Sequence, residues 1–236
     1  LYLRANESWS ILIQQEEVNK LRKIDIAQLQ VQLEEEAAKM KHLIQNLNST
    51  LKSLKRPDVV FIESAILFGE LNYGTLIKSW IGTSFTANLC WRAGRDSWSS
   101  STFHSRCDNK KPTVTIVKVG QYIFGGYATS SWDGSGWTQA SGSFIFSLRN
   151  KENLPPFKAP LKSQGTSYAI YCRSSYGPTF GGGHDLRIYN NAASNTKSYT
   201  NFGHTYQPPS GVSSSSTILA GSYRFTPSEV EVFYLV

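Results

Sequence analysis

The sequence predicts an α+β protein, mostly β, in which a two-sheet antiparallel β-sandwich with short flanking helices follows a long N-terminal coiled-coil helix. Apolar residues before position 57 recur with heptad spacing. All 18 glycines and all nine prolines lie after position 56, and so do all the aromatic residues except Tyr2 and Trp9. Short β-branched and aromatic runs there are separated by turn residues. We therefore expect a coiled-coil helix over residues 1–56 and a second domain over residues 57–236.

The N-terminal segment carries a hydrophobic seam with the alternating three-and-four spacing of a heptad repeat. The seam positions are Ile26, Leu33, Ala37, Met40, Ile44, Leu47, Leu51 and Leu54. A lone helix cannot bury such a face, so we expect a homo-oligomer through these residues, in preference to a helix folded back onto the β domain. The spacing fixes neither the number of helices nor their orientation.

The start of the second domain is expected to hold a short strand and short helices. Residues 59–62 are the expected strand, and residues 65–71 and 75–80 are the expected helical segments. The serine cluster 97–101 offers an N-cap for a helical turn through Phe103 and Cys107.

Strands are expected to dominate from residue 114 onwards. Their ranges are 114–119, 122–127, 144–148, 168–172, 186–189 and 230–235. The three prolines of residues 150–160 exclude a central strand there and indicate an exposed loop. Short strands separated by such turns pack as antiparallel sheets.

The composition limits the classes of partner. The net charge is +7, but charged residues make up only 17% of the chain and do not gather into the basic stripe of a nucleic-acid-binding protein. No stretch approaches the ~18 consecutive apolar residues of a membrane span. We therefore expect neither nucleic acid binding nor a membrane span.

The cysteines and the first residue bear on cellular location. Cys90, Cys107 and Cys172 are an odd, sparse set, which predicts no disulfide framework and favours a reducing compartment. We therefore expect an intracellular, cytoplasmic protein. The chain begins at Leu1 without an initiator methionine, so we expect a fragment whose targeting information is not visible.

A glycine-rich stretch at residues 176–189 joins two expected strands. It contains Gly177, Pro178 and the consecutive glycines Gly181, Gly182 and Gly183. A phosphate-binding loop would need Lys followed by Ser or Thr, or spaced glycines entering a helix, and neither pattern is present. We therefore expect a tight structural turn.

Residues 57–236 resemble the TLDc domain of the oxidation-resistance proteins. The resemblance rests on segments 103–108, 112–116, 124–127, 144–148, 177–186, 219–221 and 229–233, with Trp80 and Trp132, which follow the family's order. The motif positions expected to be structural are Trp80, Gly125, Gly126, Gly177, Pro178, Gly181, Gly182, Gly183, His184, Asp185, Gly221, Glu229 and Glu231.

The resemblance implies a β-sandwich flanked by short helices and carries no established catalytic activity. It also implies protection against oxidative stress and, in several members, association with the V-ATPase and regulation of its assembly. We therefore expect a non-enzymatic protein-binding module without a cofactor, with V-ATPase subunits as candidate partners. The preceding coiled coil is a departure from the best-known members of the family.

Two catalytic alternatives are weighed on residue type. A hydrolase would join Cys107 or Cys172 to His104 or His184 and to Asp108 or Asp185, but the sequence does not show that these residues meet. A metal site at His104 with Cys90, Cys107 or Cys172 lacks the usual paired ligand spacing. We expect neither a catalytic site nor a metal site.

Other polar pairs and the tryptophans are expected to be structural. His184 and Asp185 are adjacent on a strand and point to opposite faces, so they are expected to satisfy backbone groups of the turn. Glu229 and Glu231 share one face and are expected to face solvent on a terminal strand. The tryptophans Trp80, Trp91, Trp98, Trp132 and Trp137 are expected chiefly in the core, although the turn 132–137 could present rings to a sugar or a peptide.

One further alternative concerns the whole architecture. A coiled coil followed by a β-sandwich is also typical of the tripartite-motif ligases, in which the two parts form a recognition adaptor of a larger protein. A RING or B-box module upstream of Leu1 would favour that interpretation.

Overall fold

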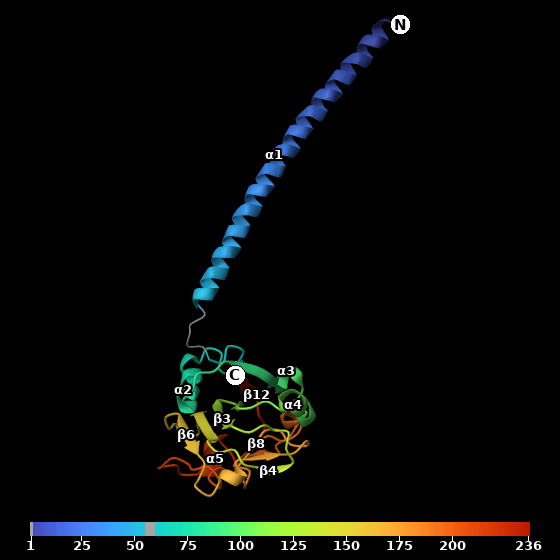
Figure 1. Cartoon of the computed structure of the whole chain (residues 1–236). Coiled ribbons are helices and arrows are strands. Elements are labelled where there is room, and N and C mark those ends of the chain that lie inside the picture. The colour runs from blue at the N-terminus through green and yellow to red at the C-terminus, as the bar shows by residue number, and fades with distance from the viewer. Residues whose placement is uncertain (1, 55–59) are drawn as a thin grey trace. The chain divides into compact units, whose positions relative to one another are not determined.

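The structure is a computed structural model that describes residues 2–54 and 60–236 (Figure 1). The chain divides into two compact units, Leu1–Arg56 and Pro57–Val236. The first unit is helical, and the second is built mainly of β-strands. Each unit is described separately below.

The N-terminal unit is one uninterrupted helix, α1 (Tyr2–Leu54), as the heptad spacing predicts (Figure 1). Of the predicted seam, the side chains of Ile26, Leu33, Ala37, Met40, Ile44 and Leu47 are exposed on this single chain. The side chains of Leu51 and Leu54 lie outside the described residues. Self-association through the seam stays a prediction. Within the described residues, no helix combines the length and the apolar composition that crossing a bilayer requires.

The β domain contains two antiparallel sheets of six strands, which confirms the predicted fold class. The first sheet has the order β1-β12-β2-β3-β5-β6. Its strands are β1 (Ala87–Arg92), β12 (Glu229–Leu235), β2 (Thr113–Val119), β3 (Tyr122–Ala128), β5 (Phe144–Arg149) and β6 (Phe157–Pro160). The last strand of the chain therefore lies inside this sheet.

The second sheet is built from much shorter strands in the order β11-β10-β9-β8-β7-β4. They are β11 (Arg224–Phe225), β10 (Ser198–Tyr199), β9 (Leu186–Arg187), β8 (Thr179–Phe180), β7 (Ile170–Cys172) and β4 (Gly136–Thr138). Four of these strands have only two residues, so their positions depend on packing more than on long ladders.

The first sheet separates two hydrophobic cores. One core lies between the sheets, where Phe124 and Val232 of the first sheet join Phe180 and Leu186 of the second. The other covers the outer face of the first sheet, where Phe146 and Phe233 pack with residues of segment 61–67 and of α2 (Leu71–Ile81). Both faces of the first sheet are therefore buried over much of their area.

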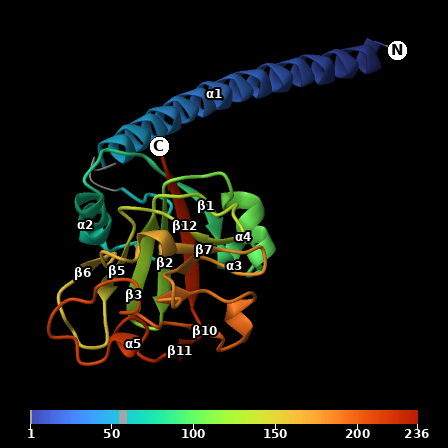
Figure 2. The ribbon, with the colours of Figure 1, turned by 60° about the horizontal axis from the view of Figure 1, so that its bottom comes forward.

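Short helices lie at the margins of the domain. α3 (Ala93–Asp96) and α4 (Ser100–Cys107) lie at the side opposite α2 (Figure 2). The predicted serine cap is confirmed, because the Ser99 side chain accepts a hydrogen bond from the amide of Ser101 at the start of α4. The remaining short helices are η1 (Thr166–Tyr168), η2 (Ala192–Ser194) and α5 (Ser215–Ile218).

Several expected elements differ from the structure. Residues 60–62 form no strand, and residues 65–69 form bends and turns before α2 begins. The predicted loop 150–160 contains β6, which its prolines confine to the edge of the first sheet. Expected strands 168–172 and 186–189 shorten to β7 and β9, since residues 166–168 form a 3₁₀ turn and only Leu186 and Arg187 pair as strand residues.

Candidate functional site

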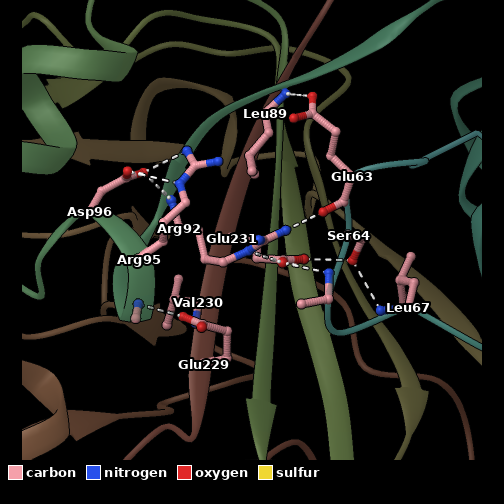
Figure 3. Close-up of polar contacts among 12 residues, drawn as sticks. Glu63, Ser64, Leu67, Leu89, Arg92, Arg95, Asp96, Glu229, Val230 and Glu231 are labelled. Atoms are coloured by element: carbon pink, nitrogen blue, oxygen red, sulfur yellow. Dashed lines mark hydrogen bonds and ion pairs between the residues drawn. The ribbon is translucent and has the colours of Figure 1, made fainter. Parts of the chain in front are cut away.

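A buried carboxylate fixes residues 61–70 on the first sheet (Figure 3). Glu231 in β12 has no exposed surface. It accepts hydrogen bonds from Ser64 Oγ at 2.5 Å and from the Ala65 amide at 2.8 Å. Arg92 Nε, on the neighbouring strand β1, donates to the same carboxylate at 2.7 Å. A buried charge is tolerated only with such partners, so Glu231 ties the segment to the sheet.

The network continues into the segment itself, which we call the anchored segment (residues 61–70). The Arg92 guanidinium also donates to the carbonyl of Glu63, and Ser64 Oγ accepts the amide of Leu67 at 2.9 Å. This arrangement leaves two large apolar side chains in solvent, Ile62 with 67% and Phe68 with 87% of its surface exposed. The anchored segment therefore presents exposed apolar groups from a backbone held by buried polar contacts.

The expectation that Glu229 and Glu231 face solvent on a terminal strand is wrong for Glu231. β12 lies between β1 and β2 instead of at an edge, and the anchored segment covers the face on which Glu231 lies. Glu229, which is half-buried on the same strand, accepts the amide of Gly94 in α3 at 2.8 Å. Each carboxylate therefore binds a different segment to β12.

The glycine-rich stretch forms the tight hairpin between β8 and β9. Gly181 has a φ of +86°, and a Cβ there would lie 2.0 Å from Asp185 Oδ2. The buried Asp185 carboxylate accepts the amides of Gly203, Thr205 and Tyr206 at 2.9–3.1 Å. Burial raises the pKa of Asp185, although these hydrogen bonds act in the opposite direction. Asp185 therefore joins the hairpin to residues 203–206, in agreement with a structural role.

The amides of the turn are largely used within the protein. The Gly181 amide donates to the Ala169 carbonyl, the Gly182 amide to Thr205 Oγ1, and the His184 amide to the Gly181 carbonyl. A phosphate-binding loop needs several backbone amides that point at the ligand. The amides of Gly181, Gly182 and His184 are therefore engaged within the protein.

His184 lies among aromatic rings at the end of the turn. The rings of Trp137, Tyr171, Tyr176 and Tyr199 have their centroids 5.4–6.0 Å from the imidazole. Its Nδ1 hydrogen-bonds the Tyr199 hydroxyl at 2.6 Å. Burial, together with the nearby Arg187 guanidinium, lowers the pKa of His184 to about 4, so the imidazole is neutral at pH 7.

A cavity of about 450 Å³ opens beside this turn. Its lining comes from β4, from residues 162–168 after β6, from the turn residue Gly182 of the glycine hairpin and from residues 204–205. The lining residues are Trp137, Lys162, Ser163, Gln164, Gly165, Tyr168, Gly182, His204 and Thr205. None of these residues is acidic, and Trp137 is the lining residue that comes from the turn 132–137.

The five tryptophans singled out in the sequence do not gather into one aromatic surface, and two of them lie in the core, where the tryptophans were chiefly expected. Trp91 and Trp132 are buried, and Trp132 donates its indole N–H to Thr113 Oγ1 at 3.0 Å. Trp80 and Trp98 are half-buried. Trp137 alone among the five is classed as exposed, with 40% of its surface in solvent. The turn 132–137 therefore presents one indole ring instead of two.

The expectation of unpaired cysteines is wrong for two of the three. Cys90 in β1 and Cys107 in α4 form a disulfide with their Cα atoms 5.5 Å apart. Cys172 is a buried free thiol whose pKa is raised by burial. The pairing removes Cys90 and Cys107 as thiolate nucleophiles or metal ligands while the bond is intact. Disulfides of this kind are typical of oxidising compartments.

The remaining histidine and aspartate candidates have structural partners. His104 Nε2 donates to the carbonyls of Arg173 and Tyr176, at 2.9 and 3.0 Å, and its Nδ1 lies 2.8 Å from Asp108 Oδ1. These contacts hold α4 against the loop after β7. His184 and Asp185 instead contact different partners outside the hairpin, Tyr199 in β10 and residues 203–206 respectively.

The other motif positions allow close packing. Gly125 and Gly126 lie in the middle of β3, where a Cβ on Gly125 would meet the Thr115 carbonyl at 1.9 Å and one on Gly126 would meet the Phe180 ring at 2.6 Å. Gly177 and Gly221 are also too crowded for a Cβ, beside Ile188 and Tyr122 respectively, and Pro178 is buried. The Trp80 ring, on α2, packs against the Phe146 ring of β5 with their centroids 6.3 Å apart.

Sequence inspection missed Arg92, Ser64 and Lys162. Arg92 and Glu231 are 139 positions apart, and no local pattern pairs them. Glu231 lies on an expected strand, whereas no element was expected at Arg92. The only signal was therefore their opposite charge, which many other pairs share. The cavity residues come from separate loops, so only the tertiary structure brings them together.

Comparison with known proteins gives one match. The family model of the TLDc domain matches residues 60–236, which contain the anchored segment, both sheets and the glycine hairpin. A search of curated proteins finds no match.

Proposed function

Because this chain belongs to the TLDc domain family, we propose that its β domain is a non-enzymatic protein-binding module and that α1 gathers several copies of it. The observation that carries the proposal is the exposure of Ile62 and Phe68 on the anchored segment. The family implies a role in oxidative-stress protection and V-ATPase subunits as the partner class.

The geometry of the anchored segment suits a binding surface. Apolar side chains that are already held in place lose little conformational freedom when a partner covers them. Phe68 follows Leu67 directly, and the Leu67 amide is bound to Ser64 Oγ, which itself donates to buried Glu231. Partner binding would therefore bury Phe68 without first ordering its backbone.

The contacts of the candidate catalytic groups support a non-enzymatic role. Cys107 is in a disulfide, and the buried Cys172 thiol has a raised pKa, which disfavours the thiolate needed for attack. Both ring nitrogens of His104 contact structural partners. A hydrolase would need one of these groups to be released first.

A binding experiment tests the surface. Immobilised full-length chain is incubated with purified V-ATPase subunits, alongside Phe68→Ser and the matched control Tyr223→Ser, which alters another exposed aromatic residue. We expect the unaltered chain and the control variant to retain V-ATPase subunits, and Phe68→Ser to retain none. If Phe68→Ser still retains the subunits, the anchored segment is not the binding surface. If the unaltered chain retains no V-ATPase subunit, these subunits are not its partners.

A second experiment tests the role of α1. Light scattering at tens of micromolar compares the full chain with a variant carrying Leu33→Lys and Leu47→Lys, two exposed seam positions. We expect an oligomer for the unaltered chain and a monomer for the variant. A monomeric unaltered chain would show that the seam does not associate copies.

The cellular location bears on the choice of partner. The cysteine count predicts an intracellular, cytoplasmic protein, and V-ATPase regulation belongs to that side of the membrane. The disulfide between Cys90 and Cys107 instead favours an oxidising compartment. A count of free thiols in protein isolated under alkylating conditions decides between the two locations. One free thiol indicates an oxidising compartment, and three indicate a reducing one.

A further inference from the structure

The cavity beside the glycine hairpin is separate from the anchored segment and has the features of a small-molecule site. Its volume of about 450 Å³ lies within the range of ligand pockets. Residues from four separate parts of the chain line it: β4, the loop 162–168, the turn residue Gly182 and residues 204–205. Asp185 holds residues 203–206 to the hairpin, so one wall of the cavity is fixed by a buried carboxylate.

An aromatic platform forms one side of the cavity. The Trp137 indole is 40% exposed and packs edge-on against Tyr168, which is 49% exposed, at a centroid distance of 5.9 Å. Tyr171 and His184 also contact the indole, at 4.5 and 5.4 Å. An exposed ring held by several neighbours offers apolar contact area at a low entropy cost, and the C–H face of a sugar ring is a complementary surface.

The polar part of the lining favours a hydroxylated ligand with a negative charge. Ser163 and Gln164 are exposed and supply hydroxyl and amide groups. Lys162 donates to the Gly203 carbonyl, which leaves the ammonium two further donors, and it forms no ion pair with any residue in the described part of the chain. The lining itself contains no acidic residue, and the buried Asp185 carboxylate behind it accepts the amides of Gly203, Thr205 and Tyr206. A ligand carboxylate could therefore pair with the Lys162 ammonium.

From these features we propose that the cavity binds an acidic sugar, whose ring packs on Trp137 and whose carboxylate pairs with Lys162. This activity goes beyond the proposed protein binding and uses a different surface. A single site of this size binds a monosaccharide weakly, with a Kd on the order of 1 mM. Copies gathered through α1 would bind a polymer of such sugars far more tightly, because each further contact is intramolecular.

The test uses two ligands that differ only at one carbon. Methyl β-glucuronide carries a carboxylate where methyl β-glucoside carries a hydroxymethyl group. Ligand-observed NMR titration of the full chain measures both affinities. We expect saturable binding of the glucuronide, with an affinity about tenfold above that of the glucoside at low salt, because only the glucuronide can pair with the ammonium.

Variants assign the two contacts. Lys162→Gln is expected to remove the preference for the glucuronide, so that the two sugars bind with equal affinity. The control Lys151→Gln, outside the cavity lining, is expected to keep the preference. Trp137→Ala is expected to abolish binding of both sugars. Ser163→Trp places a large side chain at an exposed lining position outside the glycine hairpin. We expect it to fill the cavity and to abolish binding of both sugars. Thermal unfolding confirms that each variant is folded.

Several results would overturn the proposal. They are no saturable glucuronide binding by the folded chain, equal affinity for both sugars, and glucuronide binding that survives in folded Ser163→Trp. Binding of an acetylated glutamate peptide in place of the glucuronide would assign the cavity to acidic peptides and would likewise refute a sugar site. None of these results affects the Phe68 experiment, since Phe68 is not part of the cavity lining.

Discussion

Replacement of Glu231 by Gln should destabilise the β domain more than the same change at Glu229, the other carboxylate of β12. Glutamine keeps the size of the side chain but removes the charge that faces Arg92, whose own side chain is only 19% exposed. Removing one partner of a buried ion pair costs about 3–5 kcal/mol. Because Arg92 retains some access to solvent, we expect the lower end, about 3 kcal/mol.

That free energy has a measurable thermal consequence. For a domain of this size, 1 kcal/mol shifts the Tm by roughly 2–4 °C, so Glu231→Gln should lower the Tm by about 6–12 °C. The control Glu229→Gln affects a half-buried side chain that accepts the amides of Gly94 and Val230, and should cost about 1 kcal/mol. Differential scanning calorimetry of the two variants and the unaltered chain makes the comparison.

Amide exchange and a double-mutant cycle show whether loss of the Arg92–Glu231 ion pair causes the destabilisation. Amide exchange should quicken at Ala65 and Leu67, whose N–H groups depend on Glu231 and on Ser64. A double-mutant cycle with Arg92→Met should give a coupling energy of at least about 1 kcal/mol. If Glu231→Gln costs no more than Glu229→Gln and leaves exchange in the anchored segment unchanged, the ion pair does not hold that segment.

Three further predictions follow from packing, covalent structure and titration. Gly126→Ala should cost about 1–3 kcal/mol in chemical denaturation because its methyl group would meet an aromatic ring at 2.6 Å, whereas Gly74→Ala in α2, with nothing nearer than 3.5 Å, should be neutral or stabilising. Equal effects would contradict this. Reduction of the disulfide, which closes a loop 17 positions long, should lower stability by about 3 kcal/mol, and the unreduced denatured chain should titrate one thiol with Ellman's reagent, not three. His184 should titrate by NMR near its pKa of about 4; since the unfolded imidazole protonates near 6.5, its contribution to stability is complete above 6.5 and is lost as the pH falls towards 4. A midpoint near 6.5 would show that the ring is not buried as described.

The sequence predicted those elements whose signals are local and repeated. α1 follows from heptads, β2 and β3 from long β-branched and aromatic runs, and α4 from its serine cap. The two-residue strands β10 and β11 carry too few side chains for any alternation, so only their neighbours define them. Strands this short cannot be predicted from the spacing of apolar residues.

The polar sites depend on partners distant in the chain. The alternation of Glu and Val in β12 predicts one solvent-facing side. This prediction fails for Glu231 because a strand inside a sheet can have a second layer over either face. The disulfide joins residues on a strand and a helix that pack together only in the folded domain. Residue type and spacing gave the candidates, whereas the pairings required the fold.

The disulfide links the two candidate surfaces to different environments. The proposed V-ATPase binding through the anchored segment would take place in the cytosol, where thiols are kept reduced, whereas the disulfide between Cys90 and Cys107 is typical of oxidising compartments. Since Cys90 and Cys107 are both buried, reduction would affect the packing of β1 against α4 before it affected either surface. A domain that unfolds when reduced at 37 °C could not act in the cytosol, and this result would favour the cavity over the V-ATPase assignment. A domain that keeps its fold and its V-ATPase binding after reduction would instead make the disulfide dispensable and favour the anchored segment.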